Sequence, residues 1–237
     1  RYPHKRAIVV PSGYDKDGHV LYSHLTFKQL NREVNRAANA FAEIGITRGV
    51  RTIVMGTKGY DCFVIFVALL KLGAVPVVVD PGMGLDRMVS CFQSTKPSAM
   101  ISIPKAHLLR FKYAKAFSAV DTFVSTDRFI WKKCHNYRAI TKNQPDTFEI
   151  TPTQADETAA ILFTTGSTGP ARGAIYTHGG FQAQLDHIHK HLRLGPDEID
   201  LSTYPMFALF YPAMGVTAVI PDMDPTKPAE VDPTKII

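Results

Sequence analysis

Cysteine is scarce in this sequence of 237 residues, and its scarcity excludes two kinds of crosslinked fold. Cys62, Cys91 and Cys134 are odd in number and widely spaced, so they form neither a disulfide framework nor the paired spacing of a zinc site. A fold without such crosslinks suits a reducing compartment, and we expect a cytoplasmic protein. No basic and apolar leader opens the sequence, in agreement with that expectation. Because Cys62 lies in an apolar run, it is predicted to be a small core residue.

Long blocks of like charge are also missing. The formal net charge is +6, but the basic residues are scattered, and no block is longer than Trp131-Lys132-Lys133. Aromatic and basic residues do not alternate along one face, so a nucleic-acid partner is not expected. We interpret the excess charge as a solvated surface that helps to attract anionic nucleotides.

An uninterrupted apolar run long enough to span a membrane is absent. The nearest candidate, residues 62–79, is interrupted by Lys71 and punctuated by Gly73 and Pro76. Such punctuation predicts a buried helix over 61–72, followed by a β-branched strand that ends before Asp80. We therefore expect a protein without a transmembrane segment.

Helices and strands alternate along the rest of the chain. Apolar residues recur at helical spacing after Thr26, a predicted N-cap, and Gly45 closes that helix. Further helices are predicted at 85–92 and 180–192, and strands at 7–10, 52–55, 76–79, 99–103, 159–163 and 200–203. Continuous apolar strands separated by helices are typical of an α/β fold of layered parallel β-sheets flanked by helices. The polar stretch 127–156 is predicted to be a surface excursion.

The most informative feature is a loop between two apolar segments. The run Thr164-Thr165-Gly166-Ser167-Thr168-Gly169-Pro170-Ala171-Arg172-Gly173 combines four hydroxyls, three glycines and one guanidinium. Glycines let backbone N–H groups approach an anion, hydroxyls add donors, and arginine adds a charged fork that fits phosphate. Glycine, serine and threonine also form ordinary turns, but this order after a predicted strand favours a polyphosphate ligand. No glycine-lysine-serine/threonine follows at P-loop spacing, which disfavours a P-loop NTPase.

This run resembles the phosphate-binding signature of the adenylate-forming (ANL) superfamily, which includes acyl-CoA synthetases, peptide-synthetase adenylation domains and luciferases. Two positions depart from the signature: Ala171 replaces the usual proline and Arg172 the usual lysine. The resemblance implies ATP and Mg²⁺ as cofactors, with Thr164 and Arg172 as catalytic residues. It also implies a phosphate-binding set comprising Thr164, Thr165, Gly166, Ser167, Thr168, Gly169, Arg172 and Gly173. Arginine keeps the positive charge of lysine, so we expect the binding of nucleotide phosphates to be retained. Its planar guanidinium is not equivalent to the ammonium group of lysine, and this difference bears on the rate of pyrophosphate release.

A second motif extends the resemblance. Residues 69–81, Leu-Leu-Lys-Leu-Gly-Ala-Val-Pro-Val-Val-Val-Asp-Pro, look like another core motif of the superfamily. The similarity covers essentially all of 1–237 but only the first part of a full-length adenylating enzyme. We therefore expect an incomplete N-terminal large domain without its C-terminal lid domain, inactive on its own.

The downstream segments point to one branch of the superfamily. Residues 204–210, Tyr-Pro-Met-Phe-Ala-Leu-Phe, occupy the segment that walls the acyl pocket, and Ala208 stands where many acyl-CoA synthetases have histidine. The implied substrate-binding residues are Phe207, Ala208, Leu209 and Phe210, although plain core packing explains each of them equally well. Together with 181–184 and 219–233, this segment resembles the olefin-biosynthesis branch, the β-lactone synthetases. An assembly with other olefin-pathway enzymes would follow from that resemblance.

Three functions remain open at this point. The first is ATP-dependent activation of a long-chain fatty or β-hydroxy fatty acid, followed by β-lactone formation. The second is a long-chain fatty acyl-CoA ligase, which would use coenzyme A. The third is a degenerate homologue that binds nucleotide or acyl chains without catalysis, a reading that Arg172 and Ala208 would fit.

Four histidines follow the loop and are candidates for further functional groups. His178 follows the loop closely, but a structural role outweighs that of a catalytic base. His187 and His191 share a helix face, while His189 points away. Two ligands without a third make a poor metal site, so no metal centre is assigned to them.

Overall fold

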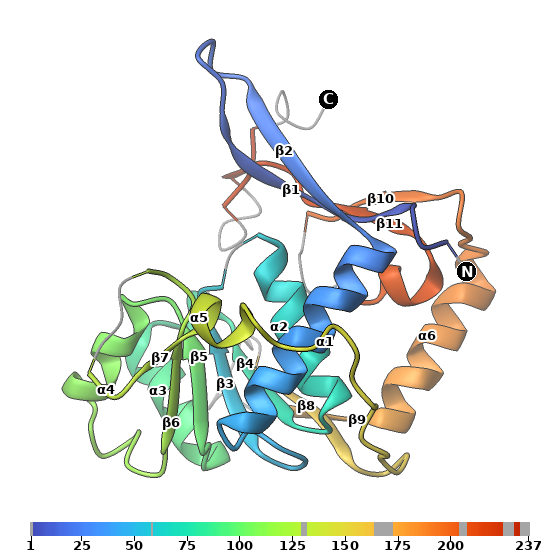
Figure 1. Ribbon diagram of the computed structural model, residues 1–237. Helices are drawn as coiled ribbons and strands as arrows, with labels where there is room; N and C mark the ends of the chain where they lie inside the picture. Colours follow the sequence, from blue (N-terminus) through green and yellow to red (C-terminus); the bar gives the residue numbers. More distant parts are fainter. Residues whose placement is uncertain are drawn as a thin grey trace. The chain divides into compact units, whose positions relative to one another are not determined.

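The computed structural model describes residues 2–57, 59–128, 132–163, 173–203, 208–224 and 230–232. The chain divides into two compact units. Unit 1 comprises residues 1–33, 58–64 and 182–237, and unit 2 comprises residues 34–57 and 65–181. Each unit contains one β-sheet, and each is described separately below (Figure 1).

Unit 1 holds a four-stranded sheet of order β10-β11-β1-β2. Its strands are β1 (Arg6–Tyr14), β2 (Val20–Thr26), β10 (Ile199–Leu201) and β11 (Thr217–Val219), with η3 (Tyr211–Met214) before the last strand. β1 pairs in parallel with β11 and antiparallel with β2. The pairing of β1 with β11 therefore joins the two ends of the chain within one unit.

Unit 2 holds a seven-stranded sheet of order β7-β6-β5-β3-β4-β8-β9. Its strands are β3 (Arg51–Met55), β4 (Val75–Val79), β5 (Ala99–Ser102), β6 (Thr122–Ser125), β7 (His135–Asn136), β8 (Thr158–Phe163) and β9 (Gly173–Thr177). Every neighbouring pair is parallel except β8–β9, which is an antiparallel hairpin. The expected α/β fold of helix-flanked, largely parallel sheets is confirmed.

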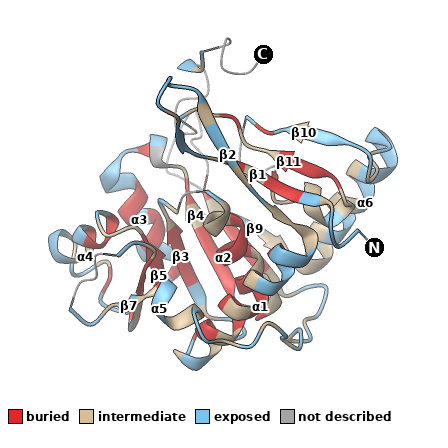
Figure 2. Ribbon diagram, turned by 45° about the horizontal axis from the view of Figure 1, so that its top comes forward, coloured by how far each residue is buried: buried red, intermediate tan, exposed pale blue. Residues whose placement is uncertain are grey.

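Helices connect these strands, and three of them continue from one unit into the other. They are α1 (Phe27–Glu43), α2 (Tyr60–Lys71), α3 (Leu85–Thr95), α4 (Leu109–Lys112), α5 (Tyr137–Thr141) and α6 (His178–Leu192), with the short turns η1 (Pro81–Met83) and η2 (Ala106–Leu108). In both views α1 and α2 lie on the side of the seven-stranded sheet away from α3 (Figures 1 and 2). Among the described residues, no helix combines the length and the apolar character needed to cross a membrane.

The predicted start of α1 is confirmed by a reciprocal pair of hydrogen bonds. The backbone N–H of Gln29 donates to Oγ1 of Thr26 at 3.3 Å, and the N–H of Thr26 donates to Oε1 of Gln29 at 2.8 Å. This capping box satisfies two donors that the first turn of a helix leaves without partners. At the other end, Gly45 takes a left-handed conformation with φ of 88°, as the predicted stop requires.

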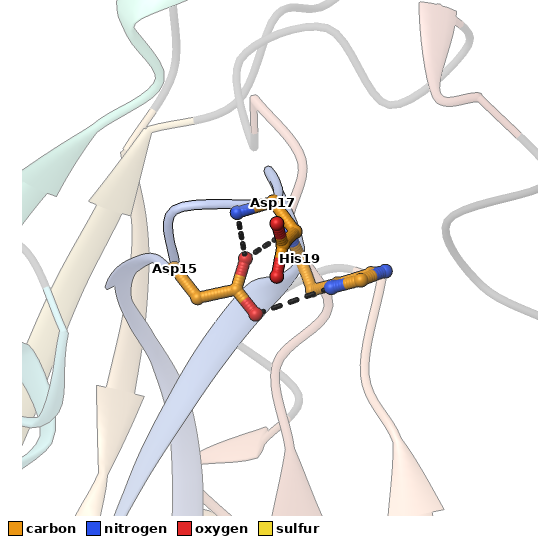
Figure 3. A group of neighbouring side chains, drawn as sticks. All are labelled: Asp15, Asp17 and His19. Atoms are coloured by element: carbon orange, nitrogen blue, oxygen red, sulfur yellow. Dashed lines mark hydrogen bonds and ion pairs between the residues drawn. The ribbon is translucent and has the colours of Figure 1, made fainter.

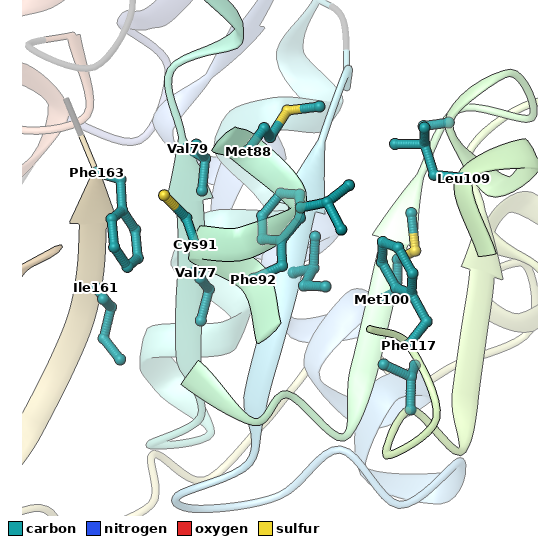
Figure 4. Packing of buried hydrophobic residues seen from close by; sticks show 14 of the residues in the cluster. Val77, Val79, Met88, Cys91, Phe92, Met100, Leu109, Phe117, Ile161 and Phe163 are labelled. Carbon is teal, nitrogen blue, oxygen red and sulfur yellow. The ribbon is translucent and has the colours of Figure 1, made fainter. Parts of the chain in front are cut away.

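The core of unit 2 lies between α3 and the strands β3, β4, β5 and β8. Every second side chain along the strands points toward α3 and packs against its buried face. Figure 4 shows this for Val77, Val79 and Phe163 of the strands and Phe92 of α3. Phe92 is completely buried, and Val77 is too. The alternate strand residues point to the opposite face of the sheet and are buried too, except for the half-buried Val78, as expected for strands covered on both sides.

Two sequence expectations need correction. The stretch 127–156 is not only a surface excursion. Its strand β7 pairs with β6 at the edge of the sheet, and its helix α5 places a buried aromatic ring against α1. Asn136 caps α5 by accepting a hydrogen bond from the N–H of Ala139 at 3.0 Å, and the ring of Tyr137, 4% exposed, lies 6.1 Å from that of Phe41. A single aromatic anchor in a polar segment gives too weak a periodicity for sequence reading to detect.

The second correction concerns the cysteines. Cys91 on α3 is buried, whereas Cys62 is only half-buried. Cys62 lies in the first turn of α2, before the helix turns its apolar face fully into the core. The apolar run around it therefore predicts the helix correctly but not the burial of this position.

Removing the ring of Phe92 is expected to destabilise the protein by about 3–5 kcal/mol, since Phe92→Ala leaves a cavity between α3 and the sheet. Urea unfolding followed by circular dichroism would measure the change. Ile150→Ala is the matched control, because Ile150 in the same unit is 60% exposed and its truncation is expected to change stability by less than about 0.5 kcal/mol. Equal effects of the two substitutions would contradict the assignment of the core.

Candidate functional site

The candidate site is the base of the predicted phosphate loop. Residues Thr164, Thr165, Gly166, Ser167, Thr168, Gly169 and Arg172 lie outside the described residues, and Gly173 is the first residue of β9. Strands β8 and β9 flank the loop. They fix where the loop begins and where it ends.

Both ends of the loop meet at one point of the sheet edge. β8 and β9 pair antiparallel in the register Leu162↔Ala174 and Phe163↔Gly173. The nine residues between this last pair therefore leave from, and return to, the carboxyl end of β8. In parallel α/β sheets the carboxyl ends of the strands are where ligands bind.

Asp80 lies beside this point. β4 pairs in parallel with β8 in the register Val79↔Phe163, and the N–H of Asp80 donates to the carbonyl of Phe163 at 3.0 Å. The carboxylate of Asp80 accepts a hydrogen bond from the N–H of Gly82 at 2.8 Å, which closes the turn after β4. The aspartate of the second motif is thus placed directly against the start of the loop.

Sequence reasoning quoted Asp80 within a motif but did not count it among the site residues. Its signal was the Asp-Pro-Gly turn directly after a run of β-branched residues, which marks the carboxyl end of a buried strand. Its nearness to the loop depends on a pairing between strands about 80 residues apart, for which a single sequence gives no signal.

Gly173 closes the loop where a side chain would not fit. A Cβ atom built at this position would lie 2.7 Å from Cζ of Phe163 and 3.0 Å from Cε1. Real Cβ contacts are not this short, and Phe163 is only 6% exposed within the core of unit 2. Glycine is therefore required here by the close approach of an aromatic ring, independently of any role in binding.

His178 lies at the opposite end of the hairpin. It follows β9 and lies five positions after Gly173, about 17 Å at the usual rise. Its backbone N–H donates to the carbonyl of Glu157 at 3.0 Å, and burial lowers the pKa of its imidazole. This position supports the structural role over that of a base acting at the loop.

An ion pair holds the same end of the hairpin. Nε of Arg48 donates to Oε2 of Glu157 at 2.9 Å, its Nη2 donates to Oε1, and the N–H of Gln154 donates to the same carboxylate at 2.7 Å. The hydrogen bond from Arg48 lowers the pKa of Glu157, and the same contact raises the pKa of the guanidinium. The pair is solvent-exposed, so we assign it to orienting the start of β8.

The predicted acyl-binding residues belong to unit 1. Phe207 lies outside the described residues. Ala208 is completely buried, and Leu209 and Phe210 are half-buried at the start of the turn before η3. The structure therefore brings Asp80, Phe163 and Gly173 together in unit 2 and describes Ala208, Leu209 and Phe210 separately in unit 1.

Among the described residues, one group has the composition of a metal site. Asp15, Asp17 and His19 lie in the turn between β1 and β2 (Figure 3). Oδ1 of Asp15 accepts hydrogen bonds from the N–H groups of Asp17 at 2.9 Å and His19 at 2.8 Å, and Nδ1 of His19 lies 3.1 Å from Oδ2. The hydrogen bond from His19 lowers the pKa of Asp15. All three residues are exposed. The hydrogen bonds among them stabilise the turn between β1 and β2, and this role explains why the three side chains lie together.

The histidines of α6 follow the predicted geometry. The rings of His187 and His191 stack with centroids 5.1 Å apart, as their spacing on one helix face requires. None of the residues of α6 is buried, and His187 and His191 belong to no group of three metal-ligand side chains among the residues described.

Gly173→Ala is expected to destabilise the protein by about 1–3 kcal/mol, because the new methyl group must displace the ring of Phe163. Denaturant unfolding would measure this cost. The double variant Phe163→Leu/Gly173→Ala should recover part of it, since the smaller side chain gives the methyl group room.

Gly195→Ala is the control for the loss of glycine itself. A Cβ atom there meets nothing within 4 Å, so the substitution should leave stability nearly unchanged or slightly increased. If Gly173→Ala behaved like Gly195→Ala, the close approach at the loop base would be refuted.

Solved structures share this fold. The crystal structure of the anthranilate-CoA ligase AuaEII with anthranoyl-AMP matches with a TM-score of 0.77 at 16% identity, over 92% of this chain and 42% of that one. The N-terminal domain of FACL13 from Mycobacterium tuberculosis matches with a TM-score of 0.78 at 19% identity, over 95% of this chain and 56% of that one. ATP-bound MatB from Rhodopseudomonas palustris matches with a TM-score of 0.76 at 20% identity, over 99% of this chain and 44% of that one.

Curated relatives are more similar in sequence. The olefin β-lactone synthetase of Xanthomonas campestris pv. campestris is 39% identical over 235 residues, which is 99% of this chain and 42% of the relative. The olefin β-lactone synthetase of Stenotrophomonas maltophilia is 40% identical over 215 residues, 90% of this chain and 38% of the relative. The chain thus spans about two fifths of the length of these relatives. Since the family model described as AMP-binding enzyme matches residues 1–226, the chain belongs to the AMP-binding enzyme family.

Proposed function

We propose that the protein uses ATP to activate a carboxylic acid as an acyl-adenylate. The observation that carries this proposal is the hydroxyl- and glycine-rich run 164–173, inserted between paired residues at the carboxyl end of a buried strand. The adjacent position of Asp80 and the membership in the AMP-binding family support it. In the reaction a carboxylate oxygen of the acid attacks the α-phosphorus of ATP, and the bond to pyrophosphate breaks.

Catalysis of this step needs little covalent chemistry from the protein. It depends on positioning the two reactants and on neutralising phosphate charge. Thr164, Thr165, Ser167 and Thr168 would donate hydrogen bonds to the β- and γ-phosphates, and Arg172 would supply a permanent positive charge. The hydroxyl and glycine donors of the run suit a polyphosphate. A Mg²⁺ ion, which keeps several waters and binds substrate phosphates, would add charge neutralisation without requiring a dedicated protein cage.

We further propose that the activated acid is a long-chain β-hydroxy fatty acid and that the product is a β-lactone. The β-hydroxyl oxygen of the substrate attacks the adenylated carbonyl carbon, the bond to AMP breaks, and the hydroxyl proton leaves. The support is the 39–40% identity to two olefin β-lactone synthetases over 90% or more of this chain. In a long-chain fatty acyl-CoA ligase the thiol of coenzyme A would attack the same carbon.

The acyl chain would lie near residues 207–210. Leu209 and Phe210, which are half-buried next to the completely buried Ala208, supply apolar surface in unit 1. A histidine in place of Ala208 would add a polar group to a dry environment, where it needs a hydrogen-bond partner. Alanine at this position therefore favours an apolar substrate.

The full-length protein, incubated with Mg·ATP and a long-chain β-hydroxy acid, is expected to release AMP and to form the acid less one water without coenzyme A. Mass spectrometry of the products would measure both. A thioester that forms only with coenzyme A would make the protein a ligase. Absence of AMP both with and without coenzyme A would refute adenylation. The remaining function would then be that of a homologue that binds nucleotide or acyl chains without catalysis.

Removal of the loop guanidinium is expected to weaken the use of ATP. Arg172→Ala should lower kcat/KM for ATP by roughly 10- to 100-fold, since one charge-assisted phosphate contact contributes about 1.5–3 kcal/mol. Arg172→Lys keeps the charge and should retain ATP binding, with any change confined to kcat. Steady-state kinetics with varied ATP would separate the two parameters.

Arg87→Ala is the matched control for this measurement. Arg87 is an exposed arginine on α3, and its removal should leave kcat and KM unchanged. Unaltered kinetics in Arg172→Ala would show that this arginine does not contact the nucleotide.

A further inference from the structure

A stretch of unit 2 far along the chain from the phosphate loop carries charge of one sign only. Between Asp86 and Asp121 the chain contains no acidic residue, and its six charged residues are all lysine or arginine. The middle of this stretch forms η2 and α4, which follow one another as continuous helical turns beside β6 and β7 (Figure 1). Basic and acidic residues are interspersed over the sequence as a whole, but this segment carries basic residues alone.

The helical turns divide into an inner and an outer face. Ala106 and Leu109 are buried in the core cluster of unit 2, together with Phe117. Leu108 and Phe111, by contrast, are 47% and 58% exposed. Single exposed apolar residues are common on protein surfaces. Here two large ones stand three residues apart on one helical face, so they form a joint apolar surface.

Lysines surround this surface. Lys105, Lys112 and Lys115 are all exposed, and they lie within one to four residues of Leu108 or Phe111. Nζ of Lys112 lies 5.1 Å from the ring centre of Tyr113, so its stem lies along the helix surface while its charge stays at the edge.

Arg110 joins a second basic segment to the first. Its guanidinium carbon lies 4.8 Å from the ring centre of Phe111 and 4.6 Å from that of Phe123, and its Nη2 donates to the carbonyl of Lys132 at 3.0 Å. This bond holds the exposed pair Lys132 and Lys133 next to α4. We call the resulting surface the α4 patch; it consists of Lys105, Leu108, Phe111, Lys112, Lys115, Lys132 and Lys133.

A shallow cleft adjoins the α4 patch. It has a volume of about 350 Å³ and lies between one face of α3 and residues 112–116, so Lys112 and Lys115 line it. The acidic residue on its wall is Asp86, whose Oδ1 accepts a hydrogen bond from the hydroxyl of Tyr113 at 2.6 Å. Two ammonium groups at the rim of a small cleft suit a phosphate-bearing headgroup.

We propose that the α4 patch binds the surface of a membrane that contains anionic lipids. Lysines attract the negative leaflet over about a Debye length, while exposed leucine and phenylalanine side chains enter the boundary between headgroups and acyl chains. An acidic protein would satisfy the lysines but would give no reason for two large apolar side chains at the centre of the patch. Nucleic acid would require bases stacked on exposed aromatic rings, and Phe111 is already covered on one side by Arg110.

This inference does not depend on the proposed function, because binding to lipid needs no catalysis. If the substrate is a long-chain acid, binding at the membrane would place the enzyme where such acids accumulate.

The test is co-sedimentation of the full-length protein with lipid vesicles. The protein should bind vesicles of phosphatidylcholine mixed with phosphatidylglycerol at low salt, bind vesicles of pure phosphatidylcholine much less, and lose most of its binding at high salt. Equal binding to both vesicle types, or no binding to either, would overturn the proposal.

Two double variants separate charge from apolar contact. Lys112→Gln/Lys115→Gln should reduce the partition coefficient roughly 25-fold, about fivefold for each lysine. Leu108→Ser/Phe111→Ser keeps every charge and should reduce it by about tenfold or more through lost insertion. Thermal unfolding of each variant would check that the fold is kept, which the exposure of all four side chains favours.

Matched controls come from exposed residues elsewhere on the chain. Lys142→Gln/Lys190→Gln removes the same charge, and Ile150→Ser/Leu192→Ser removes apolar side chains that are 60% and 61% exposed. Both should bind vesicles like the original protein. Loss of binding in the controls to the same extent as in the patch variants would overturn the assignment. So would an acidic carrier protein or a single-stranded oligonucleotide that binds the patch while vesicles do not.

Discussion

The parallel pairing of β4 with β8 is the interaction on which the candidate site depends. These strands are separated by about 80 residues of chain, and their register places Asp80 against the last residue before the loop. The pairing is held by burial: Val77 and Val79 on one strand and Ile161 and Phe163 on the other belong to the same apolar cluster as the inner face of α3. A slip of one residue would turn every one of these side chains away from α3, so packing specifies the register strongly. Apolar contacts in the core thus fix the point of the sheet from which the polar loop leaves.

A second set of contacts directs the chain into β8. The side-chain amide of Asn35 donates to the carbonyl of Asp146 at 2.7 Å, and that of Asn39 donates to the carbonyls of Pro145 and Thr147. Nζ of Lys71 donates to Oδ1 of Asn35 at 2.6 Å, and burial lowers the pKa of this lysine. Side chains of α1 therefore bond three consecutive backbone carbonyls of a segment that has no strand or helix of its own, and Lys71 of α2 holds one of these side chains in place. Three hydrogen bonds at consecutive residues tie this segment to α1 and so restrict the path by which it reaches β8.

Most elements of the fold could be predicted because their signals are local. The capping box at Thr26, the glycine stops at Gly45 and Gly73, and the β-branched run before Asp80 each act over fewer than about ten residues, and the structure confirms them. The elements that were missed depend on distant partners. The short β7 and α5 owe their existence to the packing of Tyr137 on Phe41, nearly 100 residues earlier. The predicted burial of Cys62 is wrong. The apolar run around this residue predicts a helix, but it does not predict which turns of that helix are buried in the core. For the site, composition predicts the loop, while the position of Asp80 beside it and the crowding at Gly173 follow only from the strand register.

The two proposals assign positive charge in this chain to two different distances. A guanidinium that contacts a phosphate inside a loop acts at about 3–4 Å and at reduced effective dielectric, where an ion pair is worth roughly four times its value in water. The lysines of the α4 patch act on a surface of charge through solvent, where salt screens the attraction within about 8–10 Å. The first use requires one arginine at one position, and the second requires several lysines in one region where basic residues outnumber carboxylates. A net charge of +6 describes neither use. Ionic strength should separate them: raising it should release a membrane contact long before it removes a nucleotide held by directed hydrogen bonds, because only the former depends mainly on unpaired, long-range attraction.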